Sequence, residues 1–143
     1  MIRRIHHVGI VVKRLTDAYS FYRGVLGLPL VREAEIAEQG VKAALLAAGD
    51  SEIELLEPVV TDNGIAKYLQ ARGEGLHHIC FQVDDVWVDL AELKSQGVEM
   101  IDQEPRIGIA GRICFLHPRA MQGTLVELCE PIDEPRTAVE GAG

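Results

Sequence analysis

Residues 5–12 read IHHVGIVV, and residues 76–83 read LHHICFQV. The two stretches align at an offset of 71 residues, and each leads into a segment of helical pattern that ends at a glycine. A second pair, IELLEP at 53–58 and VELCEP at 126–131, aligns at an offset of 73. Two matching landmarks at nearly the same offset indicate a tandem duplication, a feature that determines how the rest of the sequence is interpreted.

Each half carries the same order of elements. In the first half, residues 3–13 are rich in β-branched side chains and predict a strand. A helix over 17–26 follows, with Thr16 as its N-cap and Gly27 at its end. Three shorter strands complete this half, the last two joined by a Gly-Asp hairpin turn, at residues 29–34, 41–48 and 51–57.

The second half repeats this order. A strand is predicted over 77–83, and Asp84 or Asp85 begins a helix that reaches about Gln96. Its three further strands are expected near 98–101, 112–117 and 123–130. Between the halves, residues 65–71 predict a helix that Gly73 ends.

The order βαβββ, present twice, predicts an α+β fold in which tandem modules form two curled mixed sheets around a cleft. One helix per module covers one face of each sheet, and the uncovered faces then turn toward one another. We expect one domain over residues 1–143. Its parts are a first module, a linker helix, a second module and a flexible tail, at about 1–62, 63–73, 74–131 and 132–143.

The composition narrows the function classes. The 143 residues carry a formal net charge of −8, with 14 basic against 22 acidic residues and no run of lysine or arginine. Nucleic acids and membrane surfaces are therefore not expected as partners. We expect a small-molecule partner instead. No segment has the features of a signal peptide or approaches the roughly 20 apolar residues that span a bilayer. Three cysteines without a CxxC spacing indicate reduced thiols and a cytoplasmic protein.

Alternation along the strands gives candidate functional residues. His78 falls on the polar face of the strand 77–83, and the other face of that strand is apolar. The repeat makes His7 the equivalent of His78, so the two imidazoles are expected to face each other in the cleft. Their neighbours His6 and His77 are assigned to the opposite face and interpreted as structural.

Two acidic residues have unusual surroundings. Glu54 and Glu127 are repeat equivalents, and each lies between aliphatic neighbours in a predicted strand. A buried carboxylate needs a cation or hydrogen-bond donors. His7, Glu54, His78 and Glu127 together predict a divalent-metal site. Nitrogen and oxygen donors without thiolate suit Co²⁺, Ni²⁺, Mn²⁺ or Zn²⁺.

Further motifs carry a resemblance to a known family. The sequence resembles the vicinal-oxygen-chelate superfamily (the glyoxalase and bleomycin-resistance proteins) and, within it, the methylmalonyl-CoA epimerase family. The resemblance extends over about residues 3–131. Its specific motifs are GEGLHHI, EPRIG, FLHPR and GTLVEL, at 73–79, 104–108, 115–119 and 123–128.

The resemblance implies an isomerase that interconverts the (2R) and (2S) epimers of methylmalonyl-CoA by proton transfer through an enolate, and it implies a homodimer. It places the metal ligands on His7, Glu54, His78 and Glu127. Inversion of a carbon centre is most simply achieved by two acid/base groups on opposite faces. Our hypothesis assigns these roles to Glu127 and Glu54. Some epimerases have a glutamate, proposed as an acid/base, where this chain has Ala43. That acid/base assignment therefore cannot be carried over to this chain.

Several candidates and alternatives remain open. Arg106, Arg112 and Arg119 are candidates for contact with substrate carboxylate or phosphate, ahead of Arg72. His117 either lines the cleft or caps a turn. Alternative functions are a glyoxalase I-type lyase acting on a glutathione hemithioacetal and a non-catalytic binding relative. A fourth protein ligand argues against an iron dioxygenase, which uses two histidines and one carboxylate.

Overall fold

The computed structural model describes residues 1–132 and contains eight strands and three α-helices in these residues. The first four strands are β1 (Ile2–Val11), β2 (Leu30–Ile36), β3 (Val41–Ala48) and β4 (Ser51–Pro58). The other four are β5 (Gly75–Val83), β6 (Arg106–Gly108), β7 (Gly111–Leu116) and β8 (Val126–Glu130). The helices are α1 (Leu15–Tyr19), α2 (Gly64–Arg72) and α3 (Val86–Ser95). The predicted βαβββ order is therefore confirmed in both halves.

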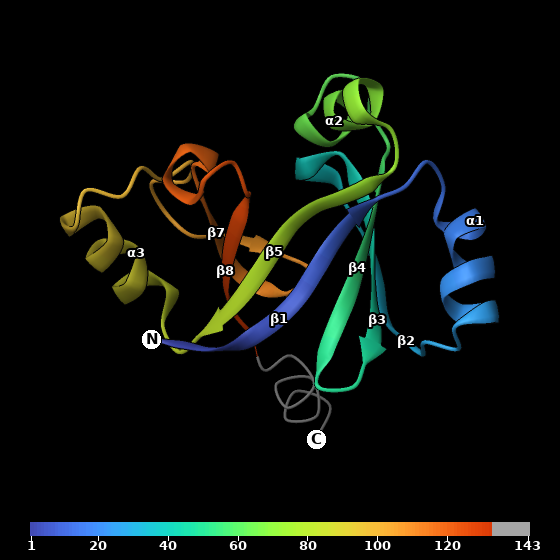
Figure 1. The fold of residues 1–143 in the computed structure, drawn as a ribbon, viewed down its shortest axis with the longest axis horizontal. Coiled ribbons are helices and arrows are strands. Elements are labelled where there is room, and N and C mark those ends of the chain that lie inside the picture. Colours follow the sequence, from blue (N-terminus) through green and yellow to red (C-terminus); the bar gives the residue numbers. More distant parts are fainter. Residues whose placement is uncertain (133–143) are drawn as a thin grey trace.

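All eight strands form one curled mixed sheet in the order β2-β3-β4-β1-β5-β8-β7-β6. β1 pairs in parallel with β4, and β5 pairs in parallel with β8. The two halves join where β1 and β5 run antiparallel at the centre of the sheet. The predicted α+β class is confirmed, with the two four-stranded sheets continuous through this central pair. Figure 1 shows the sheet curling away from β1 and β5 on both sides.

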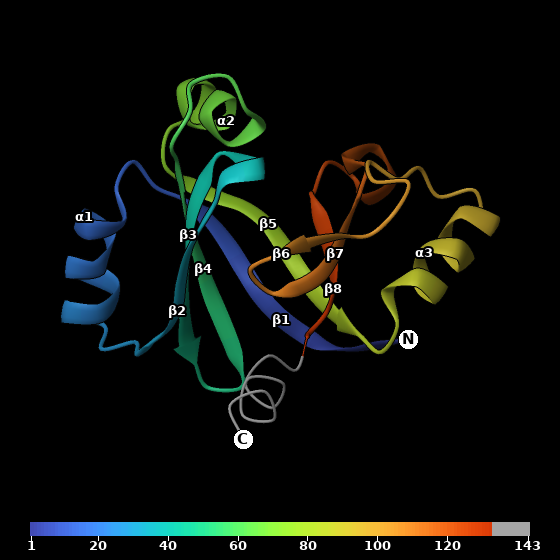
Figure 2. The same ribbon diagram turned by 180° about the vertical axis from the view of Figure 1, so that it is seen from behind.

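The helices lie around this sheet. In Figure 1, α1 and α3 lie at opposite flanks of the curled sheet, and α2 lies at one end of it. Figure 2 shows β6 and β7 curling toward β2 and β3 from the other half. A core of aliphatic residues packs under each flanking helix. Leu15, Leu46 and Leu55 belong to the core under α1, and Leu90 and Leu128 belong to the core under α3.

The first helix differs from its prediction. The predicted N-cap, Thr16, is already inside the helix, because α1 begins at Leu15 with Arg14 in the N-cap position. Arg14 makes no capping hydrogen bond through its side chain. Instead, the backbone N–H of Leu15 donates to Oε1 of Glu57, at the end of β4, over 2.8 Å. After Tyr19 the helix continues with π-type hydrogen bonding over Ser20–Val25.

The other two helices agree with their predictions. α3 begins after Asp85, whose Oδ1 accepts from the backbone N–H groups of Trp87 and Val88. α2 has Asn63 as its N-cap and ends at Gly73. Within the described residues, no helix is both long enough and apolar enough to cross a bilayer.

The second half contains one wrongly placed strand. The strand predicted near 98–101 is absent, and Met100 makes only an isolated bridge to Leu116. The strand at this place in the order is β6, which pairs with β7. Asp102 explains the break, because its Oδ2 accepts the backbone N–H of Phe115 over 2.7 Å and replaces a strand partner there. Pro105, which has no N–H, separates this loop from β6.

Candidate metal centre and its cavity

The four predicted ligands come together at the centre of the sheet. His7 lies on β1, Glu54 on β4, His78 on β5 and Glu127 on β8, so each half contributes one histidine and one glutamate. All four side chains are buried, and His7 is completely so. These are the four central strands of the sheet, and their side chains meet on its concave side. The duplication therefore brings repeat-equivalent residues to one point.

The donor atoms have the spacing of a metal site. The Nε2 atom of His7 lies 3.4 Å from Oε1 of Glu54 and 3.0 Å from Oε1 of Glu127. The Nε2 atom of His78 lies 3.2 Å and 3.0 Å from the same two oxygens. The two Nε2 atoms are 3.1 Å apart. Four donors that each lie about 2.1 Å from one ion are separated by about 3.0–3.4 Å.

The pKa shifts of the four side chains show how strongly the histidines and glutamates of this cluster interact. Burial lowers the pKa of both histidines, but the two glutamates outweigh it and raise the pKa of His7 to about 10 and that of His78 to about 9. Burial raises the pKa of Glu54 and Glu127, and the two imidazoles outweigh it and lower both. Even so, Oε1 of Glu127 accepts no well-directed hydrogen bond within the described residues, although the Nε2 atoms of His7 and His78 both lie 3.0 Å from it. A cation between the four donors would satisfy this oxygen, so the cluster fits a divalent metal.

A register irregularity overturns one expectation about the neighbouring histidines. In the β1–β5 pair, Ile5 is opposite Phe81 and His7 is opposite Cys80, so β1 has one extra residue at His6. Such a bulge breaks strict alternation. His6 is buried beside His7 on the concave side of the sheet, where the prediction had assigned it to the opposite face.

The same irregularity occurs in the second half, with the strands exchanged. Gly9 is opposite His78 and Ile10 is opposite Leu76, so β5 has one extra residue at His77. His77 therefore also lies beside its neighbour, and it lines the cavity described below. The repeated HH dipeptide was the sequence signal for these two bulges.

Each bulge supplies a contact that orients a candidate ligand. Nδ1 of His6 lies 2.8 Å from Nδ1 of His7, and Nδ1 of His77 lies 2.9 Å from Nδ1 of His78. Each contact holds one ring so that its Nε2 faces the centre. Metal-binding histidines are commonly fixed in this way through the other ring nitrogen. Burial also lowers the pKa of His77, to about 4.

Gly9 makes room for a candidate ligand, and this was not predicted from the sequence. A Cβ atom at Gly9 would lie 2.7 Å from Nε2 of His78 and closer still to two other ring atoms. The His78 ring therefore occupies the space that a side chain at position 9 would take. The signal was available in the repeat, since Gly9 aligns with Cys80 and is the smaller of the two.

A cavity of about 340 Å³ opens above the cluster. Glu54, His78 and Glu127 lie among its lining residues, so any ligand bound there reaches the candidate metal centre. Its other lining residues are largely apolar and come from both halves, with α2 contributing as well. Ala43 is buried and is absent from this lining.

Of the four candidate arginines, only Arg106 lines the cavity. Its guanidinium lies over the ring of Phe115, 5.6 Å from the centroid, and its Nε donates to Asp102. The Phe115 ring in turn meets His78 edge-on, with centroids 5.5 Å apart. Arg106 is thus two ring contacts away from the cluster.

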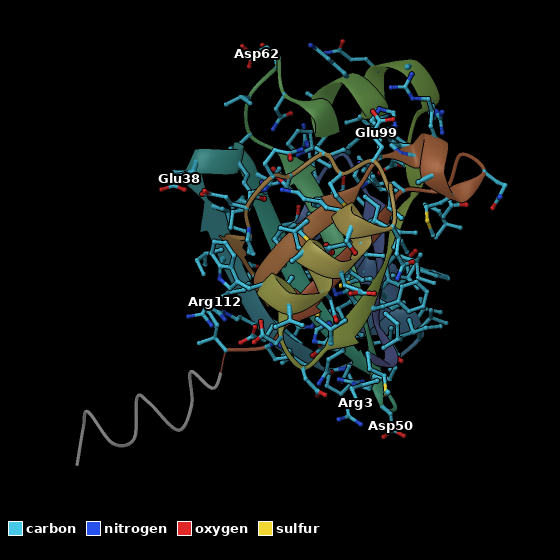
Figure 3. All side chains as sticks on the ribbon, turned by 90° about the vertical axis from the view of Figure 1, so that its left-hand side faces the viewer. Arg3, Glu38, Asp50, Asp62, Glu99 and Arg112 are labelled. Atoms are coloured by element: carbon cyan, nitrogen blue, oxygen red, sulfur yellow. The ribbon has the colours of Figure 1, made fainter. Side chains whose placement is uncertain are left out.

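The other three arginines are engaged elsewhere. Arg112 pairs with Glu130 and projects outward from the molecule (Figure 3). Arg119 pairs with Glu99, and Arg72 lies over the ring of Tyr68.

His117 caps a turn. Its Nδ1 accepts the backbone N–H of Arg119, at the start of the short 3₁₀-helix Pro118–Met121. Its predicted alternative, the lining of the cleft, is not seen, since His117 is absent from the residues that line the cavity.

The three cysteines are free and buried. Cys80 and Cys129 lie with His6 behind the metal cluster, and their sulfur and ring nitrogen atoms are all within 4.8 Å of one another. Hydrogen bonds from Cys80 and His6 outweigh burial and lower the pKa of the Cys129 thiol to about 6.

Comparisons with known proteins agree with this architecture. Residues 6–115 match the Glyoxalase/Bleomycin resistance protein/Dioxygenase superfamily. An uncharacterized protein of Bacillus subtilis, YqjC, is 42% identical over 91% of this chain and 94% of its own length. The mitochondrial methylmalonyl-CoA epimerase of Homo sapiens is 36% identical over 87% of this chain and 72% of its own. A solved methylmalonyl-CoA epimerase in complex with methylmalonyl-CoA and NH₄⁺ superimposes with a TM-score of 0.89 at 38% identity, covering 93% of this chain and 97% of that one.

Proposed function

Because the chain belongs to the Glyoxalase/Bleomycin resistance protein/Dioxygenase superfamily, we propose that it is a methylmalonyl-CoA epimerase, an isomerase of an acyl-CoA thioester. The observation that carries the proposal is the cluster of two histidines and two glutamates at the base of a cavity. The relatives and solved structures named methylmalonyl-CoA epimerase support the choice of substrate.

His7, Glu54, His78 and Glu127 would hold the metal, with Co²⁺ the first candidate and Mn²⁺, Ni²⁺ or Zn²⁺ the others. The chemistry that such an ion supplies is Lewis acidity toward the oxygen of the thioester carbonyl, which makes the α-proton more acidic. Each Nε2 of His7 and His78 lies within 3.4 Å of both carboxylates, so the four donor atoms are already gathered around one point.

Glu54 and Glu127 are the proposed acid/base pair. They come from different halves, on β4 and β8, and so approach the centre from two sides. One carboxylate removes the proton at C2 and the other returns a proton to the opposite face, which inverts the carbon. The two histidines lower the pKa of both glutamates, so each is available in the deprotonated form. The buried methyl group of Ala43 offers no third carboxylate near this centre.

The cavity has one basic side chain for the anionic part of the substrate. Arg106 lines it, and only the Nε side of its guanidinium is occupied by Asp102. The remaining N–H groups suit a carboxylate or a phosphate of the CoA moiety. The proposal includes a cytoplasmic homodimer, and the three reduced, buried cysteines support a reducing compartment.

Exchange of solvent deuterium into C2 of methylmalonyl-CoA tests the proposal. Co²⁺-loaded wild-type protein is expected to exchange the C2 proton of both epimers and to lose this activity when the metal is removed. Glu127→Gln with Co²⁺ retained is expected to slow exchange from one epimer by about 10²–10⁴-fold, the usual contribution of an acid/base group. Glu54→Gln should slow exchange from the other epimer.

Glu52→Gln provides the matched control. Glu52 lies on the same strand as Glu54 but contacts His6 and not the cluster, so its variant should exchange both epimers at a rate close to that of the wild type. Undiminished exchange from both epimers in Glu127→Gln would overturn the assignment of the bases. Turnover of a glutathione hemithioacetal without any C2 exchange would overturn the epimerase proposal in favour of a lyase.

A further inference from the structure

The outer histidine of each pair meets different surroundings in the two halves. In the first half, His6 contacts His7 through Nδ1, and its far nitrogen, Nε2, lies 3.6 Å from Oε1 of Glu52. Glu52 is directly opposite His7 in the β1–β4 pair. A carboxylate of the protein therefore faces the outer histidine of the first half.

The second half has leucine at the equivalent position. Ile79 is opposite Val126 in the β5–β8 pair, and the N–H of Ile79 donates to the carbonyl of Leu125. The same register, continued by one residue, places Leu125 opposite His78, as Glu52 is opposite His7. The repeat offset of 73 residues gives the same equivalence. Leu125 lines the cavity and offers no acceptor to the outer histidine of this half.

The far nitrogen of His77, Nε2, has no such acceptor in the part of the chain that the structure describes. Its Nδ1 lies 2.9 Å from Nδ1 of His78, and its ring meets Tyr68 edge-on, with centroids 5.1 Å apart. Over residues 1–132, the contact with His78 is the one hydrogen bond of the His77 ring. His77 is only partly buried and lines the cavity.

The contact with His78 also determines which nitrogen of His77 is the donor. When Nε2 of His78 is a ligand, the proton of that ring is on Nδ1 and points to His77. His77 then accepts at Nδ1, and the proton of its own neutral ring is on Nε2. The His77 ring, which lines the cavity beside the candidate metal centre, then carries its N–H donor at Nε2.

We propose that His77 binds ligand directly, donating a hydrogen bond from Nε2 to an anionic oxygen of a carboxylate-bearing compound held at the four-residue centre. The inference rests on the proposed function for the identity of this ligand, the malonyl-type head group of an acyl-CoA. It assigns selectivity to the second half, since His6 in the first half is enclosed and faces Glu52. A ligand that lacks a carboxylate oxygen near Nε2 gains nothing from His77.

Malonate is the probe that tests this, with its binding to Co²⁺-loaded protein measured by calorimetry. His77→Asn keeps an acceptor near the Nδ1 position for His78 but removes the outer donor. We expect malonate to bind about tenfold more weakly, the usual cost of a lost hydrogen bond to a charged group. In His77→Gln, the longer side chain returns an N–H near the position of Nε2, and we expect affinity within about threefold of the wild type.

His6→Asn makes the same change in the first half and controls for effects transmitted through a metal ligand. Co²⁺ affinity is measured separately for each variant, and His6→Asn is expected to bind malonate at least about fivefold more tightly than His77→Asn. Leu125→Glu, which copies Glu52 into the second half, should weaken malonate binding as His77→Asn does. Equal malonate affinity in His77→Asn and wild type, or no malonate binding by the wild type, would overturn the inference.

The same preparations separate this inference from the proposed function. A wild-type protein that exchanges no deuterium into methylmalonyl-CoA, but whose malonate affinity depends on His77, would refute the epimerase proposal and support the inference. Exchange that proceeds normally while malonate affinity is indifferent to His77 would do the reverse.

Discussion

The two halves of the chain share the residues that the candidate metal centre needs and differ in the residues around them. β1 and β4 supply His7 and Glu54, and β5 and β8 supply His78 and Glu127 in the same parallel pairing. Each histidine has a second histidine against its Nδ1, placed there by a bulge. This symmetric part is the part that a four-donor metal site requires.

The residues that differ between the halves lie next to the candidate metal centre and make its surroundings asymmetric. The two hydrogen-bond donors proposed for an anionic ligand, His77 and Arg106, both line the cavity and both come from the second half. The first half contributes the carboxylate of Glu52 behind its own outer histidine. The comparison indicates that duplication supplied the candidate metal centre as two equivalent pairs, and we propose that divergence of the halves then gave the cavity one side suited to an anion.

The largest expected effect is the pH dependence of Co²⁺ affinity, because one histidine from each half must lose a proton before the metal binds. In the metal-free protein, the glutamates outweigh burial and raise the pKa of His7 to about 10 and that of His78 to about 9. Near pH 7 both imidazoles then carry a proton that a metal ion must displace. The affinity for Co²⁺ should therefore rise about a hundredfold per pH unit and level off above pH 9–10, once both protons have gone.

Co²⁺ titrations at several pH values, with proton release measured in a weakly buffered solution, check this slope. Two protons released per ion would show that both halves contribute a protonated histidine. One proton per ion would mean that only one half does and would break the symmetry of the comparison. The same raised pKa values stabilise the metal-free fold fully below about pH 6.5, and this contribution is lost as the pH rises through about 9–10.

The sequence was sufficient for the elements that the repeat marks twice and for the clustering of the four candidate ligands. The four candidate ligands were predicted because each has a repeat equivalent, and a carboxylate among aliphatic neighbours called for a cation or hydrogen-bond donors. The structure brings the four side chains together, and their role as metal ligands stays a prediction. The bulges at His6 and His77 were not predictable from alternation within one strand. An extra residue in a strand can be recognised only from the residues that it faces on the neighbouring strand. The segment 98–101 remains a single bridge for a different reason, because the side chain of Asp102 accepts the N–H of Phe115 on β7 and stops the pairing there.

Gly9 gives the second test of the comparison, with a smaller expected effect. A methyl group at this position would overlap the ring of His78, so Gly9→Ala must displace that ligand. We expect Co²⁺ affinity to fall by about 10–100-fold, as when the support of a ligand is lost. The equivalent residue, Cys80, is opposite His7 and already carries a side chain, so Cys80→Ala should change the affinity far less.

Calorimetric titration with Co²⁺ measures both variants, and Gly24→Ala is the control for a glycine substitution. A Cβ atom at Gly24 would have the carbonyl oxygen of Tyr19 as its nearest neighbour, at 3.9 Å, and would displace nothing. If Gly9→Ala bound Co²⁺ as the wild type does, the His78 ring would have to be held by contacts other than those seen here.

The smallest effect concerns the helices at the two flanks. The N–H of Leu15 at the start of α1 donates to Glu57, and the N–H of Val86 at the start of α3 donates to Glu130, its repeat equivalent. α3 has a second cap in Asp85, whereas the N-cap residue of α1 contributes no side-chain hydrogen bond. Glu57→Ala should therefore lower the free energy of unfolding by about 1–2 kcal/mol, and Glu130→Ala by only about 0.5 kcal/mol.

Urea unfolding of the Co²⁺-loaded proteins measures these differences, and a double variant completes the comparison. Removing Asp85 as well as Glu130 takes both side-chain caps from α3 and makes it resemble α1 without Glu57. The double variant Asp85→Ala/Glu130→Ala should then lose at least as much stability as Glu57→Ala alone. Equal losses for the two single variants would contradict the argument, because they would show that Asp85 adds nothing where Glu130 is absent. The halves would then be equivalent at their helix starts, and the asymmetry of the molecule would be confined to the cavity.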